Sequence, residues 1–286
     1  MYNLKKRNSG VFSNRLNKTS TPKVRQLGAS LMELMVGITI GLLVVLAAIG
    51  SLVYTRVSST TMVDATRLQQ KADAAFRLIN FQTLQAGSLE LSPTVEPATV
   101  VFSTAYTGFD PLITSLATNI VSVHGVDGDG TTTQDILRIS YQDDGTVRDC
   151  LGQATANTTQ GIRVDNQFTY VPITGGGGDI TCRGAAAGAT AQPILDGVED
   201  FQVTYGVRTV TAAGAENFQY LTATNVTDWT NIQTVNVCLQ LRGDAQGNPQ
   251  PGMAAIVGCT PPTTIANDGR LRRVFNRTFS LRNALL

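Results

Sequence analysis

The longest apolar run of the chain lies near its N-terminus, where residues 34–54 contain 21 positions and no charged side chain. As a helix, such a run is long enough to cross the hydrocarbon core of a bilayer, roughly 30 Å. The pattern then changes, because from Thr55 to Ala86 apolar residues recur at steps of three and four, as in a helix with one buried stripe. The stripe consists of Ala65, Leu68, Ala72, Ala75, Phe76 and Ile79.

The two patterns belong to one predicted helix. No proline interrupts residues 29–92, and Gly87 is a natural stop signal. We therefore expect a single helix over residues 29–86, with a transmembrane part at 29–57 and an amphipathic part at 58–86.

After Gly87 the chain becomes rich in Thr, Val, Gly, Asn and Asp, with short apolar runs between turn signals. No helical pattern of crossover length separates these runs, so the strands should pair antiparallel. The predicted fold class is α+β, a long N-terminal helix whose amphipathic half packs on an antiparallel sheet within residues 58–286. The predicted strands are Thr99–Phe102, Ile136–Tyr141, Phe168–Pro172, Val198–Val207, Thr234–Leu241 and Arg272–Leu281.

Charge divides the chain at the start of the apolar run. Residues 1–28 hold seven Lys and Arg and no acid, so by the positive-inside bias this leader stays in the cytoplasm and the rest faces outward. Of the 22 basic residues of the chain, 15 then remain against 21 acids, a net charge of −6 for residues 29–286. An acidic exported part argues against a broad electrostatic grip on nucleic acid.

The order of signals differs from that of an ordinary secretory signal, in which small residues follow the apolar region. Here the small residue, Gly28, precedes the apolar run. We therefore expect the run to be retained and any cut to fall between Gly28 and Ala29. Glu33 stands at the edge of the membrane segment, where a carboxylate is costly and functional by default.

The residues Gly28, Ala29, Ser30, Leu31 and Glu33, followed by an apolar helix, resemble the class III signal of type IV pilins and type II secretion pseudopilins. The resemblance implies that a prepilin peptidase cuts after Gly28 and methylates the new N-terminus at Ala29. It also implies that Glu33 serves assembly and register. Ala29 departs from the more usual Phe of the family. The alternative from the residues alone is a plain membrane anchor with Glu33 reaching the headgroups.

Later segments are similar to the PilW-type minor pilins, and they cover most of the mature chain. That resemblance implies a pilin fold and a structural subunit that helps to initiate pilus assembly, at or near the tip, in support of motility, adhesion or DNA uptake. A minor pseudopilin of a type II secretion system is the alternative. The segments are Arg77–Gly87, Asp135–Tyr141, Asp149–Gly152, Ile194–Val207, Val235–Arg242 and Leu271–Asn283.

The family also implies partners and a location. The partners are other minor pilins and the major pilin, through the N-terminal helix, together with the prepilin peptidase and the assembly platform. Before assembly the protein is expected in the inner membrane, crossing it once with its C-terminus in the periplasm, and afterwards in the extracellular fibre.

Four cysteines, Cys150, Cys182, Cys238 and Cys259, lie on the exported side, where two disulfides are expected. Of the three possible pairings we favour Cys150–Cys182 and Cys238–Cys259, the nearest neighbours in sequence. A zinc site fits poorly, because no two cysteines lie within four residues and His124 is the only histidine.

Other candidate chemistry is weak. Asp127, Asp129, Thr131 and Asp135 faintly resemble a calcium loop but lack its glycine and glutamate, and a turn between strands explains them. The glycines 175–178 precede neither Lys-Ser/Thr nor a helix, so a flexible loop is favoured over a phosphate cradle. We expect no catalytic residue, metal or cofactor.

The C-terminal segment has two interpretations. Five arginines there are interleaved with Phe275 and Phe279, which allows either a DNA-contacting edge or a core strand whose arginines pair with carboxylates. The acidic exported part favours the second interpretation. The arginines are Arg270, Arg272, Arg273, Arg277 and Arg282.

The signal can be tested through its glycine. Gly28→Ala should slow or block cleavage while leaving membrane insertion intact, because the apolar run is unchanged. Mass analysis of the N-terminus, in cells with and without the prepilin peptidase, checks this. An intact Met1 on the wild-type protein in peptidase-competent cells contradicts the signal.

Overall fold

The computed structural model describes residue 28 and residues 30–88, 121–129, 134–143, 146–154, 162–174, 176–184, 190–210, 214–246, 258–259 and 268–283. The predicted strand Thr99–Phe102 and the leader before Gly28 lie outside these residues, as does Ala29.

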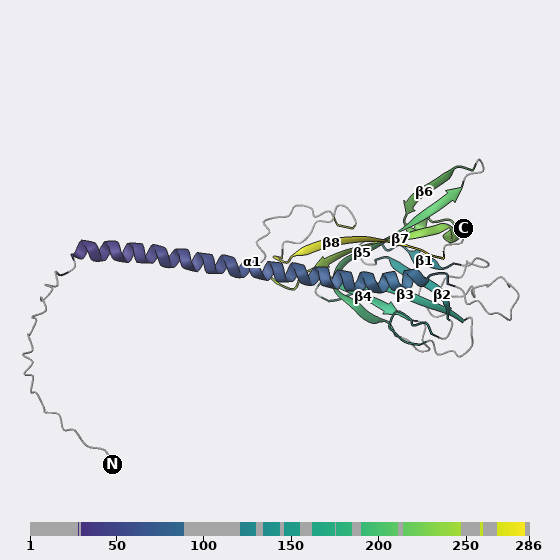
Figure 1. Ribbon diagram of the computed structural model, residues 1–286, viewed down its shortest axis with the longest axis horizontal. Coiled ribbons are helices and arrows are strands. Elements are labelled where there is room, and N and C mark those ends of the chain that lie inside the picture. Colours follow the sequence, from purple (N-terminus) through teal and green to yellow (C-terminus); the bar gives the residue numbers. More distant parts are fainter. Residues whose placement is uncertain are drawn as a thin grey trace, which may run out of the picture. The chain divides into compact units, whose positions relative to one another are not determined.

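One helix, α1, runs from Leu31 to Gln85, which confirms the predicted helix within two residues at each end (Figure 1). The chain leaves it through Gly87, whose φ of 71° is a left-handed conformation that glycine adopts without strain. The Gly87 amide donates to the Ser140 carbonyl at 2.9 Å, so the end of the helix is tied to the sheet.

The chain divides into two compact units, residues 1–52 and 53–286, and the boundary falls within α1. In the first unit every described residue is exposed, including all of 31–52. By length and composition this part of α1 is able to cross a membrane.

The second unit holds an eight-stranded sheet in which all pairs are antiparallel. The strand order is β1-β2-β3-β4-β5-β7-β8, and β6 pairs with the far half of the long strand β5. Two 3-10 turns, η1 (Ala223–Asn225) and η2 (Trp229–Asn231), precede β7. The strands are β1 Val123–Val126, β2 Ile136–Asp143, β3 Ile162–Pro172, β4 Gly178–Arg183, β5 Gln192–Val210, β6 Glu216–Leu221, β7 Ile232–Arg242 and β8 Arg272–Ser280.

Five predicted strands are therefore confirmed as parts of β2, β3, β5, β7 and β8. Strands β1, β4 and β6 were not predicted from the sequence. Strand β1 has only four residues, β4 includes Gly178 and Asp179, and β6 has no buried residue. Such strands lack the long apolar alternation on which the prediction relied.

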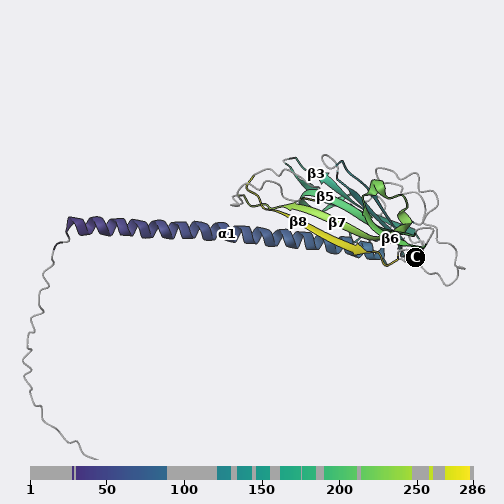
Figure 2. The ribbon, with the colours of Figure 1, turned by 90° about the horizontal axis from the view of Figure 1, so that it is seen from above.

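The second half of α1 packs on one face of the sheet (Figure 2), which makes this an α+β fold with the predicted layers. Phe76 and Ile79 are almost fully buried, and the Phe76 ring lies 6.0 Å from that of Phe279 on β8. The polar Asp64 and Gln82 are buried beside the apolar stripe, which its pattern did not predict. The buried residues of α1 are Asp64, Leu68, Ala72, Ala75, Phe76, Ile79, Gln82 and Thr83.

Strand β5 leaves a gap on one edge, because β4 pairs with it up to Val198 and β6 from Tyr205 onward. The segment before β2 fills that gap. Gln134 Oε1 accepts from the Phe201 amide at 3.2 Å, Asp135 Oδ2 accepts from the Val203 amide at 2.7 Å, and the Asp135 amide donates to the Phe201 carbonyl. The backbone groups of a buried edge are thus satisfied by two side chains.

Removal of a helix side chain from this interface should destabilise the exported part. Ile79→Ala deletes buried methyl groups and leaves a cavity, so we expect the free energy of unfolding to fall by roughly 2–5 kcal/mol. Denaturant unfolding of a fragment starting near Ser58 measures it. The exposed Gln70→Ala on the same helix is the control and should change stability by less than about 0.5 kcal/mol; equal effects would contradict the packing.

Candidate functional site: the start of helix α1 and its attachment to the sheet

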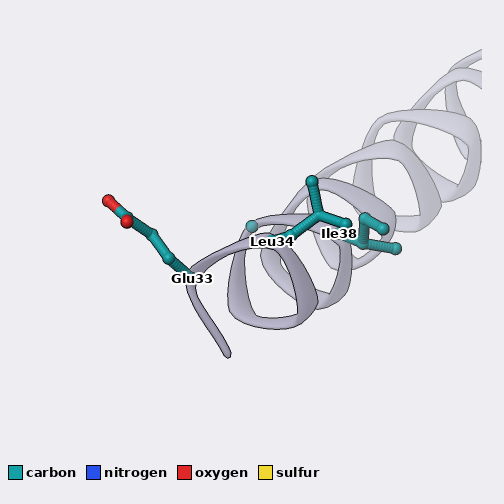
Figure 3. A pocket seen from close by; sticks show the side chains of 4 residues that line it. Glu33, Leu34 and Ile38 are labelled. Atoms are coloured by element: carbon teal, nitrogen blue, oxygen red, sulfur yellow. The ribbon is translucent and has the colours of Figure 1, made fainter. Parts of the chain in front are cut away.

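The start of α1 places one carboxylate ahead of a long apolar surface. The Leu34 amide donates to the Ser30 carbonyl at 3.1 Å, and Glu33 lies in the first turn, where the helix dipole favours an acid. Figure 3 shows the Glu33 side chain standing away from the helix, beside a shallow surface groove lined also by Leu34, Gly37 and Ile38.

This surface has no partner within its own unit. From Leu31 to Arg56 every residue of α1 is exposed, and the side chains are mostly apolar, with charges only on Glu33 and Arg56. Exposed apolar area of this extent marks a surface meant for lipid or for another chain. Gly28, the predicted cleavage position, is also exposed.

In the second unit, disulfides join Cys150 to Cys182 and Cys238 to Cys259, with Cα–Cα distances of 6.4 and 5.6 Å. These are the two pairings that the sequence analysis favours. The second bond fixes Cys259, which lies on the connection between β7 and β8, to the middle of β7.

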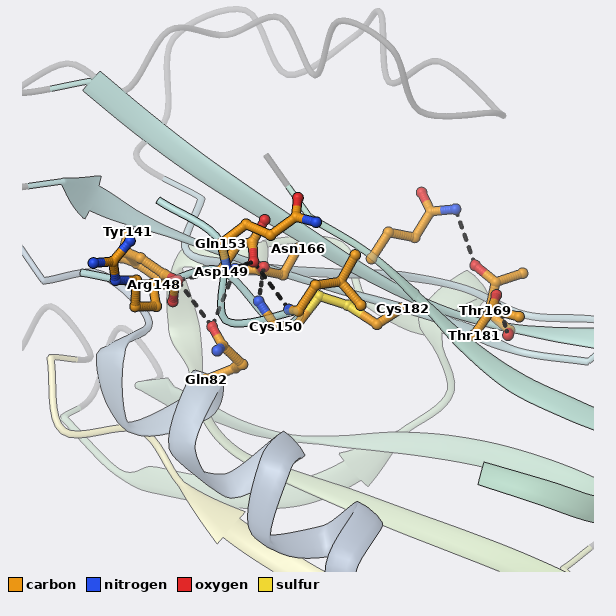
Figure 4. The surroundings of a disulfide bond; sticks show 12 residues. Gln82, Tyr141, Arg148, Asp149, Cys150, Gln153, Asn166, Thr169, Thr181 and Cys182 are labelled. Atoms are coloured by element: carbon orange, nitrogen blue, oxygen red, sulfur yellow. Dashed lines mark hydrogen bonds between the residues drawn. A yellow bond between two sulfur atoms is a disulfide. The ribbon is translucent and has the colours of Figure 1, made fainter. Parts of the chain in front are cut away.

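A buried polar network attaches the end of α1 to the sheet beside the first disulfide (Figure 4). Gln82 Oε1 accepts from the Asn166 amide at 3.1 Å and lies 2.9 Å from the Tyr141 hydroxyl. Asn166 Oδ1 in turn accepts from the Cys150 amide at 2.8 Å. The helix, the strands β2 and β3 and the Cys150 loop are therefore held in one arrangement by side chains that are fully removed from water.

Most of the C-terminal arginines pair with carboxylates of the same chain. Arg272 is buried and its guanidinium contacts Glu199 on β5 at 2.8 and 3.0 Å and Asp268 at 2.7 and 3.0 Å. Arg277 reaches Asp73 on α1 at 3.2 Å, with its guanidinium 5.1 Å from the centre of the Phe76 ring. This is the core-strand arrangement, in which the arginines stabilise the sheet and its helix.

A register shift brings Glu199 to Arg272. Val198 pairs with Leu241 and Asp200 with Gln240, so Glu199 is the extra residue of a bulge in β5. Hydrogen bonds from Arg272 lower the pKa of Asp268 to about 2, despite partial desolvation of that carboxyl. The pairing of Glu199 with Arg272 was not predictable from local sequence, because the two residues are 73 positions apart and the bulge in β5 leaves no local pattern.

Two residues of the faint calcium loop, Asp127 and Asp135, bind backbone amides, and Thr131 lies outside the described residues. Asp127 accepts from the amides of Ala223 and Thr224, both at 2.7 Å, and Asp135 accepts from those of Gly128 and Val203. Burial raises the pKa of Asp135 to about 6. In the described part of the chain no group of three His, Cys, Asp or Glu side chains is arranged to hold a metal ion.

His124, the only histidine, is part of an aromatic cluster. Its ring lies 4.5 Å from that of Trp229, which in turn meets the Tyr205 ring edge-on at 4.9 Å. The ring therefore fills space at the β1 end of the sheet.

The polar groups of the second unit described above pair within that unit. The Glu33 carboxylate and the exposed apolar surface at the start of α1 have no such internal role. The family model for the type IV pilus-assembly protein W, PilW, matches residues 173–283. The matched residues include all of β4, β5, β6, β7 and β8, and therefore Glu199, Arg272 and the Cys238–Cys259 bond. This part of the chain is similar to the PilW family.

Among solved structures, a type IV-like pilin from Thermus thermophilus is similar, with 15% sequence identity and a TM-score of 0.34 over 58% of this chain and 87% of that one. No curated protein sequence matches the chain.

The ion pairs of the region that the family model matches have a defined pH dependence. The pKa of Asp268 is lowered in the folded state from 3.8 to about 2, so its contribution to stability is present above about pH 4 and is lost as the pH falls from 4 to 2. Asp268→Asn should lose roughly 1–2 kcal/mol of unfolding free energy at pH 7, since Arg272 keeps Glu199. Its stability should then depend less steeply on pH between 4 and 2.

Urea unfolding between pH 2 and 7 provides the measurement. Asp244→Asn, at a carboxylate whose side chain is 66% exposed, is the control. Parallel pH profiles for wild type and Asp268→Asn would show that the pair with Arg272 adds nothing.

Proposed function

We propose that this protein is a PilW-type minor pilin that helps to initiate assembly of a type IV pilus, at or near its tip. It is made as an inner-membrane prepilin, cut after Gly28 and methylated at Ala29. In the membrane the exported domain faces the periplasm, and after assembly the subunit is part of the extracellular fibre.

The observation that carries this proposal is the exposed apolar surface of α1, interrupted at its start by Glu33 alone. A single membrane anchor needs an apolar helix, and the helix dipole offsets only part of the cost of a carboxylate at the edge of the membrane. When the helix leaves the lipid and packs against neighbouring helices, an acid in its first turn can fix the register between them. An unpaired charge in a low dielectric is penalised, whereas a charge that meets an opposite charge is not.

An amine at the same depth in the packed helices would pair with the Glu33 carboxylate. Cleavage after Gly28 creates a positive N-terminus at Ala29, four residues before Glu33. When helices of adjacent subunits pack side by side, the amine of one meets the Glu33 carboxylate of the next. The other minor pilins, the major pilin and the assembly platform are the partners of this surface.

The exported domain supplies a firm base for this interaction. Ion pairs of Asp73 with Arg277 and of Lys71 with Asp196 at 2.8 Å join α1 to the sheet, in addition to the Gln82 network. These contacts hold the second half of α1 against the sheet while subunits are added.

Replacement of the carboxylate tests the proposal. Glu33→Ala removes the partner of the Ala29 amine and eases residence in the bilayer. We expect a variant that is correctly cleaved and accumulates in the inner membrane, but enters sheared pilus fractions several-fold less than wild type. Immunoblots of membrane and sheared fractions, with electron-microscopic counts of pili, measure this.

Glu33→Asp is the matched variant, because it keeps the charge and shortens the side chain by one methylene. An intermediate defect is expected, since the pairing depends on reach. Entry of Glu33→Ala into fibres at the wild-type level would reduce Glu33 to a residue at the headgroups and would remove the register argument, while the cleavage argument would stand.

A further inference from the structure

Strand β6 has an edge that the protein leaves open. Among the residues that the structure describes, β6 pairs only with β5, and the last residues of β5, Arg208 to Val210, pair only with β6. The two strands therefore form a hairpin that extends past the end of β7 (Figure 1). Five of the six residues of β6 are exposed, and only Leu221, at the end of the strand, packs against the core.

The other edges of the same sheet are protected. Strand β1 has only four residues, which is too short for extensive pairing. Strand β8 carries Arg273 and Arg277, and charged side chains discourage the addition of a strand. The gap along β5 is filled by Gln134 and Asp135.

None of these devices occurs on β6. It has no Lys, Arg or Pro, and its register with β5 is free of bulges. Its one charge, on Glu216, is held in an ion pair by Arg208 on the neighbouring strand. An unprotected edge of six residues is a template for main-chain pairing with another chain.

The side chains of this edge are ordered before any partner arrives. Phe218 and Tyr220 share one face, 48% exposed each, with their rings 5.4 Å apart and perpendicular. The Phe218 ring lies across Gly206 on β5, where a Cβ would collide with it, and the Tyr220 hydroxyl is 3.5 Å from that of Thr234. The opposite face carries the amides Asn217 and Gln219.

We propose that β6 receives an extended segment of a different pilus subunit, which adds a strand to this edge. The segment is uncharged, because β6 offers it no free charge. It alternates apolar or aromatic residues, which meet Phe218 and Tyr220, with polar residues, which meet Asn217 and Gln219. The inference rests on the proposed function, since that function supplies neighbouring subunits of other kinds.

Photo-crosslinking in piliated cells tests it with the full-length protein. A benzophenone amino acid replaces the exposed Asn217 on β6 or, as a control, the exposed Asn276 on the β8 edge. After irradiation, the sheared pili are digested and the crosslinked peptides are identified by mass spectrometry. We expect position 217, and not 276, to crosslink to an extended segment of another subunit.

Two lysine substitutions, one on each strand edge, provide a further test. Gln219→Lys puts a charge on the open edge and should abolish the crosslink from position 217, whereas Asn276→Lys, on an edge that already carries arginines, should not. Both sites are exposed, so both variants should fold, and the denaturation midpoints of the two proteins check this.

Several other outcomes would overturn the inference. Crosslinks from position 217 only to a second copy of this chain would overturn the inference, and so would a crosslink that survives Gln219→Lys. Pili that contain the protein, and need it, but give no crosslink from position 217 would overturn the inference while leaving the proposed function standing. Normal piliation without the gene, with the protein absent from pili, would overturn both.

Discussion

Burial of one stripe of α1 against the sheet determines the rest of the arrangement, because a helix of 55 residues has only its second half to anchor it. Between Asp64 and Thr83 the stripe turns toward the sheet, and Phe76 and Ile79 lose nearly all contact with water. Burial of each such side chain contributes about 1.5–3 kcal/mol. The contacts of Gln82 with Tyr141 and Asn166 add direction, since their hydrogen bonds fit one rotation and one depth of the helix.

The two halves of α1 differ in what their side chains contact. Beyond Asp64 several polar groups of α1 pair with the sheet, as Lys71 does with Asp196 and Asp73 with Arg277. From Leu31 to Thr55 every residue is exposed and Glu33 is the only charged one. The sheet shows a similar contrast, because Arg272 and Arg277 of β8 form internal ion pairs, whereas no described strand pairs with the outer edge of β6.

Much of this followed from local patterns in the sequence. The helix, its stop at Gly87 and the strands around Val203 and Val237 were predictable, because period, glycine and alternation act over a few residues. Strand β6 was not, since a strand exposed on both faces shows no alternation. The partners of Gln82 and Glu199 were not predictable either, because they depend on strand register and on a bulge, which distant parts of the chain determine together.

The Cys238–Cys259 bond bears on how the domain carries mechanical load. In both views β8 runs alongside α1 (Figures 1 and 2), and the two touch through Phe76 with Phe279 and Asp73 with Arg277. Tension on the second half of α1 would therefore be shared by β8, by β5 through Lys71 and Asp196, and by the Gln82 network, and from β8 it would pass to the nine register pairs that join β8 to β7. If those pairs parted, the Cys238–Cys259 bond would still hold Cys259 to β7, 13 positions before Arg272 in the sequence. The disulfide thus keeps β8 covalently attached close to β7 under load.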